Sequence, residues 1–302
     1  MTKELTEYIA KRKQEINALI VAHYYQLPEI QEVADFVGDS LQLAKQAADT
    51  DAKVIVFCGV HFMAESAKIL SPQKTVLLPE KEAGCPMADM VTAEALRKKK
   101  AMYPDALVVS YVNTSAEVKA ETDICCTSSN AVKVVSSIPA DKEIIFVPDR
   151  NLGSYIESQT GRKMILWEGC CPIHDQLTVK EIDEQLALHP EAKVVVHPEV
   201  AASVALRADA VCSTSGILDY VKNSPEGEFI IGTEEGFIYT LNKHCPGKKL
   251  YLARSEFLCK DMKYTTLEKL ALSMETMQHQ VEVAEDIRQK AYISLERMLN
   301  IS

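Results

Sequence analysis

The chain reads Ile20-Val-Ala-His23-Tyr-Tyr25 near its start, and the same pattern returns in Val108-Val-Ser-Tyr111-Val-Asn113 and Val194-Val-Val-His197-Pro-Glu199. Each stretch is an apolar run that becomes polar at its C-terminal end, which is typical of a buried strand in a parallel sheet. The pattern recurs after roughly 90 residues each time, so it indicates one structural unit written three times.

The later segments of the unit recur as well. A second short strand leads into a hydroxyl-bearing helix start in Phe36-Val-Gly-Asp-Ser40, Ile124-Cys-Cys-Thr-Ser128 and Ala210-Val-Cys-Ser-Thr214. A third strand is expected at Val54–Cys58, Ile144–Val147 and Phe229–Ile231, and a fourth at Lys74–Leu78, Lys163–Trp167 and Lys248–Leu252. Because helical stretches separate these runs, we predict an α/β fold of three pseudo-threefold-related three-layer αβα sandwich domains, each with a four-stranded parallel sheet.

The repeats also suggest domain boundaries. We expect a first unit with an N-terminal helix at 1–97, a second at 98–183, and a third with C-terminal helices at 184–302. The segment from Thr265 to Ile301 has helical periodicity and should pack across a seam between units. Ligand sites of parallel sheets lie beyond the carboxyl ends of the strands, so three sheets facing one axis should share a central site.

Composition narrows the class of protein. The 302 residues are 47% hydrophobic, enough for a sizeable core, and no signal segment or long apolar run suggests export or a membrane span. A net charge of −10 disfavours nucleic acid and anionic membranes as partners. Nine cysteines, an odd number without a signal, predict thiols or metal ligands in a reducing compartment, so we expect a cytoplasmic protein.

One cysteine follows the fourth strand of each unit. Cys85, Cys171 and Cys259 lie 60 to 62 positions after the first polar residue of their unit (23 to 85, 111 to 171, 197 to 259). Three thiolates can hold zinc or an iron-sulfur cluster. His174 could be a fourth zinc ligand, whereas three cysteines on a 4Fe-4S cluster would leave one iron open as a Lewis acid. The repeats do not decide between Cys171 and the adjacent Cys170.

Polar residues at the strand ends and helix starts suggest a substrate site. The pairs His23 with Tyr25, Tyr111 with Asn113, and His197 with Glu199 are spaced to share a strand face, and their different chemistries suit an asymmetric small molecule. Ser40, Ser128 and Thr214 are expected as helix N-caps. Helix starts also bind carboxylate or phosphate, so they could hold an anionic substrate despite the net negative charge.

Over essentially its whole length, the chain resembles the quinolinate synthase family. The matching stretches are Ala22-His-Tyr-Tyr-Gln26, Gly84-Cys-Pro-Met-Ala-Asp89, Tyr111-Val-Asn113, Cys126-Thr-Ser128, Pro148-Asp-Arg-Asn-Leu-Gly153, Trp167-Glu-Gly-Cys-Cys-Pro-Ile-His174, His197-Pro-Glu199, Ser213-Thr-Ser-Gly216 and Gly232-Thr-Glu234. In that family the middle cysteine ligand precedes the histidine by three positions. The resemblance therefore favours Cys171 over Cys170.

The resemblance implies a transferase that condenses iminoaspartate (iminosuccinate) with dihydroxyacetone phosphate to quinolinate for NAD biosynthesis, releasing phosphate and water. It also implies one 4Fe-4S cluster per chain on Cys85, Cys171 and Cys259, and transfer of the imine from L-aspartate oxidase. The implied substrate-binding residues are His23, Ser40, Tyr111, Val112, Asn113, Ser128, His197, Pro198, Glu199 and Thr214. We assign proton transfer to Tyr25 and Glu199, and positioning or proton transfer to His23 and Tyr111.

Two rival functions fit the same architecture. Three-domain, three-cysteine iron-sulfur enzymes of diphthamide synthesis modify a protein with the aid of adenosylmethionine, and fold alone does not decide function. A module that only stores or senses a cluster is the second rival. Turnover of iminoaspartate with dihydroxyacetone phosphate separates the enzyme from the storage module, and cleavage of adenosylmethionine identifies the radical chemistry.

Overall fold

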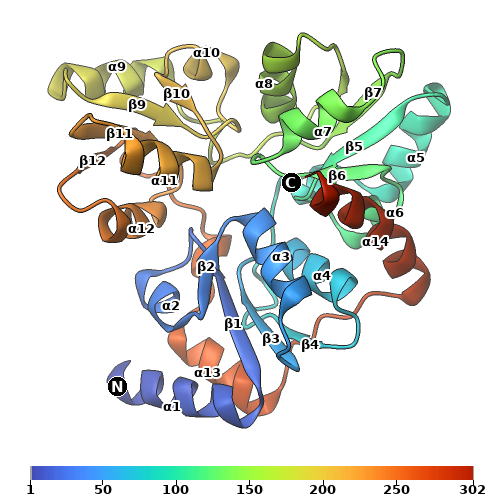
Figure 1. Cartoon of the computed structure of the whole chain (residues 1–302), viewed down its shortest axis with the longest axis vertical. Helices are drawn as coiled ribbons and strands as arrows, with labels where there is room; N and C mark the ends of the chain where they lie inside the picture. The colour runs from blue at the N-terminus through green and yellow to red at the C-terminus, as the bar shows by residue number, and fades with distance from the viewer. Residues whose placement is uncertain (1, 302) are drawn as a thin grey trace.

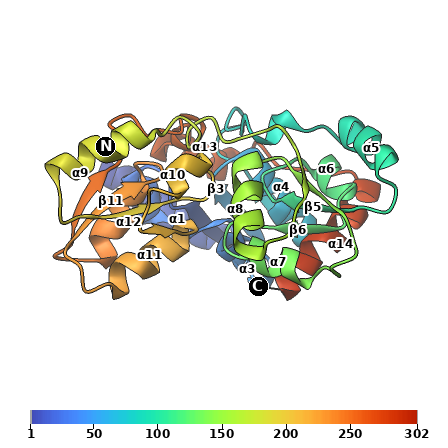
Figure 2. The ribbon, with the colours of Figure 1, turned by 90° about the horizontal axis from the view of Figure 1, so that it is seen from above.

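Three α/β units surround a common centre in the computed structural model, which describes residues 2–301 (Figure 1). Met1 and Ser302, the outer ends of the first and third predicted units, lie outside the described residues. Each unit contains a four-stranded, all-parallel sheet in which the strands stand in the order second, first, third, fourth. The predicted fold class is therefore confirmed. Figure 2 shows that the units lie side by side in one layer.

Helices and strands alternate in the same way in every unit. The first contains α1 (Thr2–Glu15), β1 (Ala18–His23), α2 (Pro28–Val33), β2 (Phe36–Gly38), α3 (Ser40–Asp49), β3 (Val54–Cys58), α4 (His61–Leu70) and β4 (Thr75–Leu77). After η1 (Ala88–Met90), the second contains α5 (Ala93–Met102), β5 (Leu107–Tyr111), α6 (Ala116–Ala120), β6 (Ile124–Cys126), α7 (Ala131–Ser137), β7 (Ile144–Val147), α8 (Arg150–Thr160) and β8 (Ile165–Leu166). The third contains α9 (Val179–Leu188), β9 (Lys193–Val196), α10 (Ala202–Ala205), β10 (Ala210–Val211), α11 (Thr214–Asn223), β11 (Glu228–Gly232), α12 (Phe237–His244) and β12 (Lys249–Leu252).

An aspartate fixes the first two strands of each unit in the same way. The Asp35 carboxylate accepts a hydrogen bond from the backbone N–H of Ile20 at 2.9 Å. Asp123 and Asp209 bind the equivalent N–H groups of β5 and β9, each at 2.8 Å. This contact recurs at a separation of 15 residues in all three units, so the repeat seen in the sequence is also a repeat of side-chain contacts.

The central strands form the core, and the edge strands are shorter than predicted. All five residues of β3 are buried, as expected for a strand covered by helices on both faces. The fourth strands contain Thr75–Leu77 and Ile165–Leu166 where Lys74–Leu78 and Lys163–Trp167 were expected. Each of these strands pairs on one side only, with β3 or β7, so its regular hydrogen bonding ends early.

Two helices at the C-terminal end of the chain follow η2 (Asp261–Lys263). Helix α13 (Leu267–Thr276) packs against α1 of the first unit, and α14 (Glu285–Asn300) packs against α6, β6 and α4 (Figure 1). Helix α14 therefore spans the seam between the first and second units, which confirms the expected packing of this segment. Among the described residues, no helix has the length and apolar character needed to cross a membrane.

Candidate active site

The carboxyl ends of the three sheets meet at one cavity, as predicted for parallel strands around a common centre. The predicted residues that line it are His23, Tyr25, Ser40, Cys85, Tyr111, Asn113, Ser128, Cys171, His197, Glu199, Thr214 and Cys259. Val112 and Pro198 are buried between lining residues but do not themselves line the cavity. The structure thus gathers side chains of all three units into one chamber.

The polar pairs reach the cavity from turns rather than from a strand face. β1 ends at His23 and β5 at Tyr111, so Tyr25 and Asn113 lie beyond the strands. The first and third units use the same turn: the backbone N–H of Tyr25 donates to His23 Nδ1 at 3.1 Å, and that of Glu199 donates to His197 Nδ1 at 3.4 Å. The expectation of a shared strand face was wrong, because these strands end at or before the first polar residue.

The predicted helix caps were wrong by one position at two helices. Helix α3 begins at Ser40, but its N-cap is Asp39, whose side chain accepts from the N–H of Gln42 at 2.9 Å in a capping box. Helix α11 begins at Thr214, and its N-cap is Ser213. Asp39 and Ser213 each accept from one free N–H group of their helix, so the hydroxyls of Ser40 and Thr214 remain available to the cavity that they line.

Ser128 is not a cap either. Helix α7 begins at Ala131 with Asn130 as the N-cap residue, and the Asn130 side chain instead accepts from the N–H of Thr127 at 2.8 Å. The Ser128 hydroxyl lies 3.2 Å from His197 Nε2 and so joins the second unit to the third. Ser128 therefore contacts His197 at the cavity and does not cap a helix.

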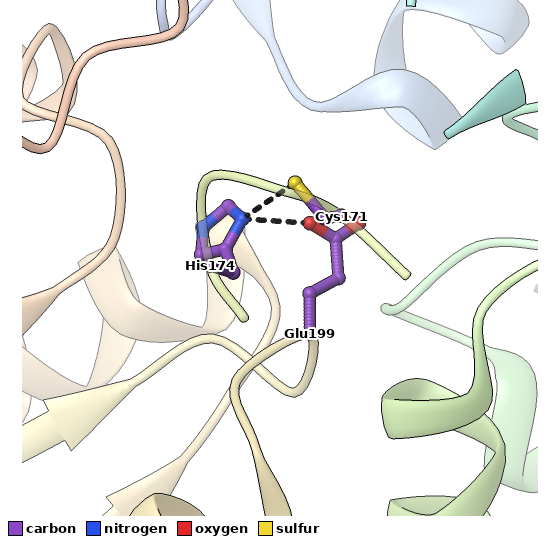
Figure 3. Close-up of side chains that lie close together, drawn as sticks. All are labelled: Cys171, His174 and Glu199. Carbon is purple, nitrogen blue, oxygen red and sulfur yellow. Dashed lines mark hydrogen bonds and ion pairs between the residues drawn. The ribbon is translucent and has the colours of Figure 1, made fainter. Parts of the chain in front are cut away.

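Glu199 is the polar centre of the cavity wall. The Tyr111 hydroxyl donates to its Oε1 at 2.7 Å, and His174 Nδ1 lies 2.8 Å from its Oε2. The same nitrogen lies 3.2 Å from Cys171 Sγ, and Figure 3 shows it facing both partners. The ligand atoms of Cys171, His174 and Glu199 all lie within 4.8 Å of one another, so this group could also hold a metal ion.

The hydrogen bonding continues from His174 to the first unit. His174 Nε2 lies 2.9 Å from the Thr233 hydroxyl, which lies 2.6 Å from the Tyr25 hydroxyl. Tyr25 and Glu199 are therefore joined through Thr233 and His174, although the four residues come from three different units.

Burial sets the charge of these groups. Loss of water raises the pKa of Glu199, but the neighbouring His197 and His174 outweigh that effect and hold the pKa below its ordinary value. Burial lowers the pKa of His23 to about 4 and that of His197 to about 4. Burial raises the pKa of Tyr25 and Tyr111 well above 10. Near neutral pH the site therefore combines the Glu199 carboxylate with neutral imidazoles at His23 and His197 and with the protonated phenols of Tyr25 and Tyr111.

The three repeated cysteines face the same cavity from the loops after β4, β8 and β12. Removal from bulk water raises the pKa of Cys85 to about 12 and that of Cys259 to about 11, and it raises the pKa of Cys171 well above 9. Charge on Cys259 would further raise the pKa of Cys85. These raised pKa values favour the protonated thiols. A bound cation would favour the thiolates instead, because metal ligation requires deprotonated sulfur.

Contacts between the loops hold these cysteines in place. The N–H of Gly84 donates to Asp261 Oδ1 at 3.1 Å and so ties the Cys85 loop to the Cys259 loop. The N–H of Cys259 donates to Glu234 Oε1 at 3.1 Å. Trp167 Nε1 donates to the Met90 carbonyl at 2.8 Å and joins the loops of the second cysteine and the first. Sulfur donors that converge from loops joined by hydrogen bonds fit a metal or cluster that prefers soft ligands.

The adjacent cysteines of the second loop face different surroundings. Cys171 lines the cavity with Cys85 and Cys259. Cys170 does not, and its Sγ lies 3.5 Å from Asp175 Oδ2 outside the lining. All nine cysteines are free thiols. The cavity therefore groups Cys171 rather than Cys170 with the other two, which agrees with the choice that the family motif favoured.

Several residues of the site were missed in the sequence. Asp39, Ser129, Glu234 and Asp261 line the cavity, and Thr233 lies directly behind it. Thr233 and Glu234 follow the third strand of their unit, so the strand-end reasoning used for the first strand would have found them. Asp39 resembles an ordinary helix cap, and its contacts with other units are visible only in three dimensions.

Three parallel sheets that enclose one buried set of thiols, imidazoles, phenols and a carboxylate define an enzyme-type site for a small polar molecule. The family model described as "Quinolinate synthetase A protein" matches residues 7–300. Proteins named quinolinate synthase are similar along nearly the whole chain: that of Desulforudis audaxviator is 54% identical over 99% of both chains, and that of Methanosarcina barkeri is 53% identical over 99% of this chain and 98% of its own. The chain therefore belongs to the quinolinate synthase family, as its motifs predicted.

Proposed function

We propose that this protein condenses iminoaspartate with dihydroxyacetone phosphate to quinolinate, releasing phosphate and water. One observation carries the proposal: a single cavity built by all three units holds three convergent thiols beside an ionised, hydrogen-bonded Glu199. Membership of the quinolinate synthase family supplies the product. The two substrates are the part of the proposal that an assay must establish.

The cofactor that we propose is one 4Fe-4S cluster on Cys85, Cys171 and Cys259. When bound, such a cluster would supply an open iron that acts as a Lewis acid on the substrate. Zinc is the rival, because His174 and Glu199 stand beside Cys171 and offer nitrogen and oxygen ligands. Quantifying iron, sulfide and zinc in the purified protein distinguishes a 4Fe-4S cluster from a zinc ion.

Donors at the helix starts would hold the carboxylates of iminoaspartate. Ser40 and Thr214 stand at the first positions of α3 and α11, where unpaired N–H groups and the helix dipole favour anions. The Ser128 hydroxyl and Asn113 face the same cavity. These local donors would overcome the net charge of −10, which otherwise repels a dicarboxylate.

Proton transfer in this proposal belongs to Tyr25 and Glu199. Glu199 is ionised and already accepts hydrogen bonds, so it can take up a proton, whereas the Tyr25 phenol keeps its hydrogen at neutral pH and can donate. His23 and Tyr111 position the substrate or assist in proton transfer. Val112 and Pro198 contribute through the backbone that places their neighbours, because neither lines the cavity.

The supply of substrate and the cellular location are further parts of the proposal. We propose that iminoaspartate is transferred from L-aspartate oxidase, and that the protein works in the cytoplasm. The nine free thiols fit a reducing compartment of that kind.

An anaerobic assay tests the function. The reconstituted protein is mixed with dihydroxyacetone phosphate and iminoaspartate generated in the same tube, and quinolinate and phosphate are measured by chromatography. We expect equal amounts of both, and neither product from the metal-free protein. Cleavage of adenosylmethionine would favour the diphthamide-type enzyme, and an intact cluster without turnover of either kind would favour a storage module.

A further inference from the structure

Asn151 of the second unit holds the backbone of Glu199 in the third unit. It is the second residue of α8, is 8% exposed, and does not line the cavity. Its Nδ2 donates to the Glu199 carbonyl oxygen at 3.0 Å and to Asp175 Oδ1 at 2.7 Å. A side-chain amide nitrogen carries two hydrogens, so these two contacts use both of them.

The second acceptor, Asp175, is itself held in place. It follows Cys171 by four positions, and its N–H donates to the Cys171 carbonyl at 2.9 Å. Arg150 Nη2 lies 3.1 Å from Asp175 Oδ1 and 3.0 Å from Oδ2. A carboxylate paired in this way only accepts hydrogen bonds, so the Asn151 amide must present its nitrogen to Asp175. Asn151 therefore links the turn of Glu199 to the loop of the second cysteine.

The equivalent turn of the first unit is held in a comparable way. Tyr25 occupies the position of Glu199, and the Tyr25 carbonyl accepts from Lys263 Nζ of the third unit. Lys263 follows the third cysteine by four positions, as Asp175 follows the second. In both turns a nitrogen donor from another unit therefore binds the carbonyl of a residue to which the proposed function assigns proton transfer. The donors differ, while the acceptor position is the same.

An anchored carbonyl also restrains the side chain of its residue. Because the peptide group is planar, fixing its oxygen restricts the rotation of Glu199 about its own Cα–C bond. The carboxylate at the other end of Glu199 accepts from the Tyr111 hydroxyl at 2.7 Å. Tyr111 and Asn151 both belong to the second unit, so this unit holds Glu199 by its side chain and by its backbone. Asn151 supplies the backbone contact.

We propose that Asn151 is a positioning residue for the quinolinate-forming reaction: its amide anchors the Glu199 peptide and so keeps the Glu199 carboxylate directed at the cavity. The inference rests on the proposed function, which assigns proton transfer to Glu199. Asn151 lies outside the cavity lining, so it contacts no substrate and acts only through Glu199 and Asp175.

Matched variants test this role by kinetics. Asn151→Ala removes both N–H donors, whereas Asn151→Asp keeps the shape, replaces the amide nitrogen by oxygen and suits the first turn of a helix. Tyr155→Phe is the control, because it removes a donor on the same helix that binds a third-unit carbonyl, that of Val211, at 3.2 Å outside the cavity lining. We expect both Asn151 variants to lower kcat about 10- to 100-fold, with the KM for iminoaspartate changed less than about 3-fold, since a misplaced catalytic group weakens the transition state. Tyr155→Phe should keep the wild-type kcat.

Amide hydrogen exchange, measured by mass spectrometry on the anaerobically purified protein, is a readout that does not depend on activity. The turns 197–200 and 23–26 contain the same two backbone N–H contacts to their histidine. In both Asn151 variants the turn 197–200 should exchange at least about 5-fold faster, whereas the turn 23–26, which Lys263 holds, should exchange as in wild type. A general loss of stability would accelerate both turns. Tyr155→Phe should change neither.

The outcomes separate this proposal from the proposed function. Unchanged exchange in the turn 197–200, equal acceleration of both turns, or a wild-type kcat in both Asn151 variants would overturn the positioning role. If wild type makes no quinolinate while only the turn 197–200 loosens, the proposed function is wrong and the role of Asn151 in that reaction fails with it, although Asn151 does anchor the turn. If wild type makes quinolinate and the variants fail either comparison, the function stands and the positioning role is rejected.

Discussion

The Asp39 carboxylate accepts a hydrogen bond of 2.5 Å from the hydroxyl of Ser215, which follows it by 176 positions. The same oxygen, Oδ2, accepts from the Ser129 hydroxyl at 2.8 Å, while Oδ1 caps α3. Three side chains, one from each unit, therefore meet at this point of the cavity wall. The junction is a hydrogen-bonded tie between all three units.

Replacing Asp39 by alanine should destabilise the protein. The change removes a helix cap and two contacts between units, so we expect the free energy of unfolding to fall by about 2–4 kcal/mol. Ser129→Ala and Ser215→Ala should each cost about 1 kcal/mol. Urea unfolding of the metal-free protein measures these losses, with Asp141→Ala in an exposed turn as the control. Equal stability of Asp39→Ala and Asp141→Ala would show that the junction contributes nothing.

Gly169 precedes the Cys170-Cys171 pair at a point where no side chain fits. A Cβ atom at this position would lie 2.4 Å from the Pro148 carbonyl oxygen, a backbone atom that cannot turn aside. We therefore expect Gly169→Ala to cost about 3 kcal/mol and to lower metal content by displacing Cys171. Gly227→Ala is the matched control, because a Cβ there meets no atom within 4 Å. Full metal loading in Gly169→Ala would contradict the expected displacement of the loop.

Sequence patterns predicted the parts of the fold that depend on local chemistry. Buried runs such as Val54–Cys58 stand out because both faces of a parallel strand are apolar. The repeat then predicts that Cys85 and its two equivalents converge, since equivalent positions occupy equivalent places in each unit. The start of α3 was predicted one residue late, because the adjacent polar residues Asp39 and Ser40 both suit a cap and only the hydrogen bond to Gln42 decides between them.

Contacts between units could not be predicted in this way. Thr233 contacts Tyr25 and His174 only because three loops from three sheets meet, and no sequence spacing encodes that meeting. The tie between Asp39 and Ser215 is of the same kind. The family motifs contain all of these residues except Asp39, but a motif alone does not show which side chains touch.

His23 should make stability depend on pH. Burial lowers its pKa to about 4 in the folded protein, below the unfolded value of about 6.5. The unfolded chain therefore binds more protons between these values, so stability falls as pH falls from 6.5 toward 4, by about 3 kcal/mol, and is unaffected by this group above that window. Urea unfolding of metal-free wild type and His23→Gln across pH 4 to 8 should show a shallower slope in the variant. Parallel slopes would mean that His23 is protonated in the folded state as readily as in the unfolded chain.

Glu199→Gln should remove most of the activity without unfolding the protein. Glutamine can still accept a hydrogen bond from Tyr111 but cannot take up a proton, so kcat should fall about 10²- to 10⁴-fold. Glu65→Gln is the control: this buried carboxylate accepts from the N–H of Ala116 at 3.1 Å and lies outside the cavity lining, so its loss should affect stability but not kcat. A wild-type rate in Glu199→Gln, measured in the anaerobic quinolinate assay, would exclude Glu199 from proton transfer.

Metal analysis of cysteine variants tests whether Cys85, Cys171 and Cys259 hold one cluster. Wild type, Cys85→Ala, Cys171→Ala, Cys259→Ala and Cys170→Ala are purified anaerobically, and iron and sulfide are quantified per chain. We expect about four irons and four sulfides in wild type and in Cys170→Ala, and loss of both in the other three variants. Zinc in place of iron, or full iron in any of Cys85→Ala, Cys171→Ala and Cys259→Ala, would contradict a cluster held by these three thiols.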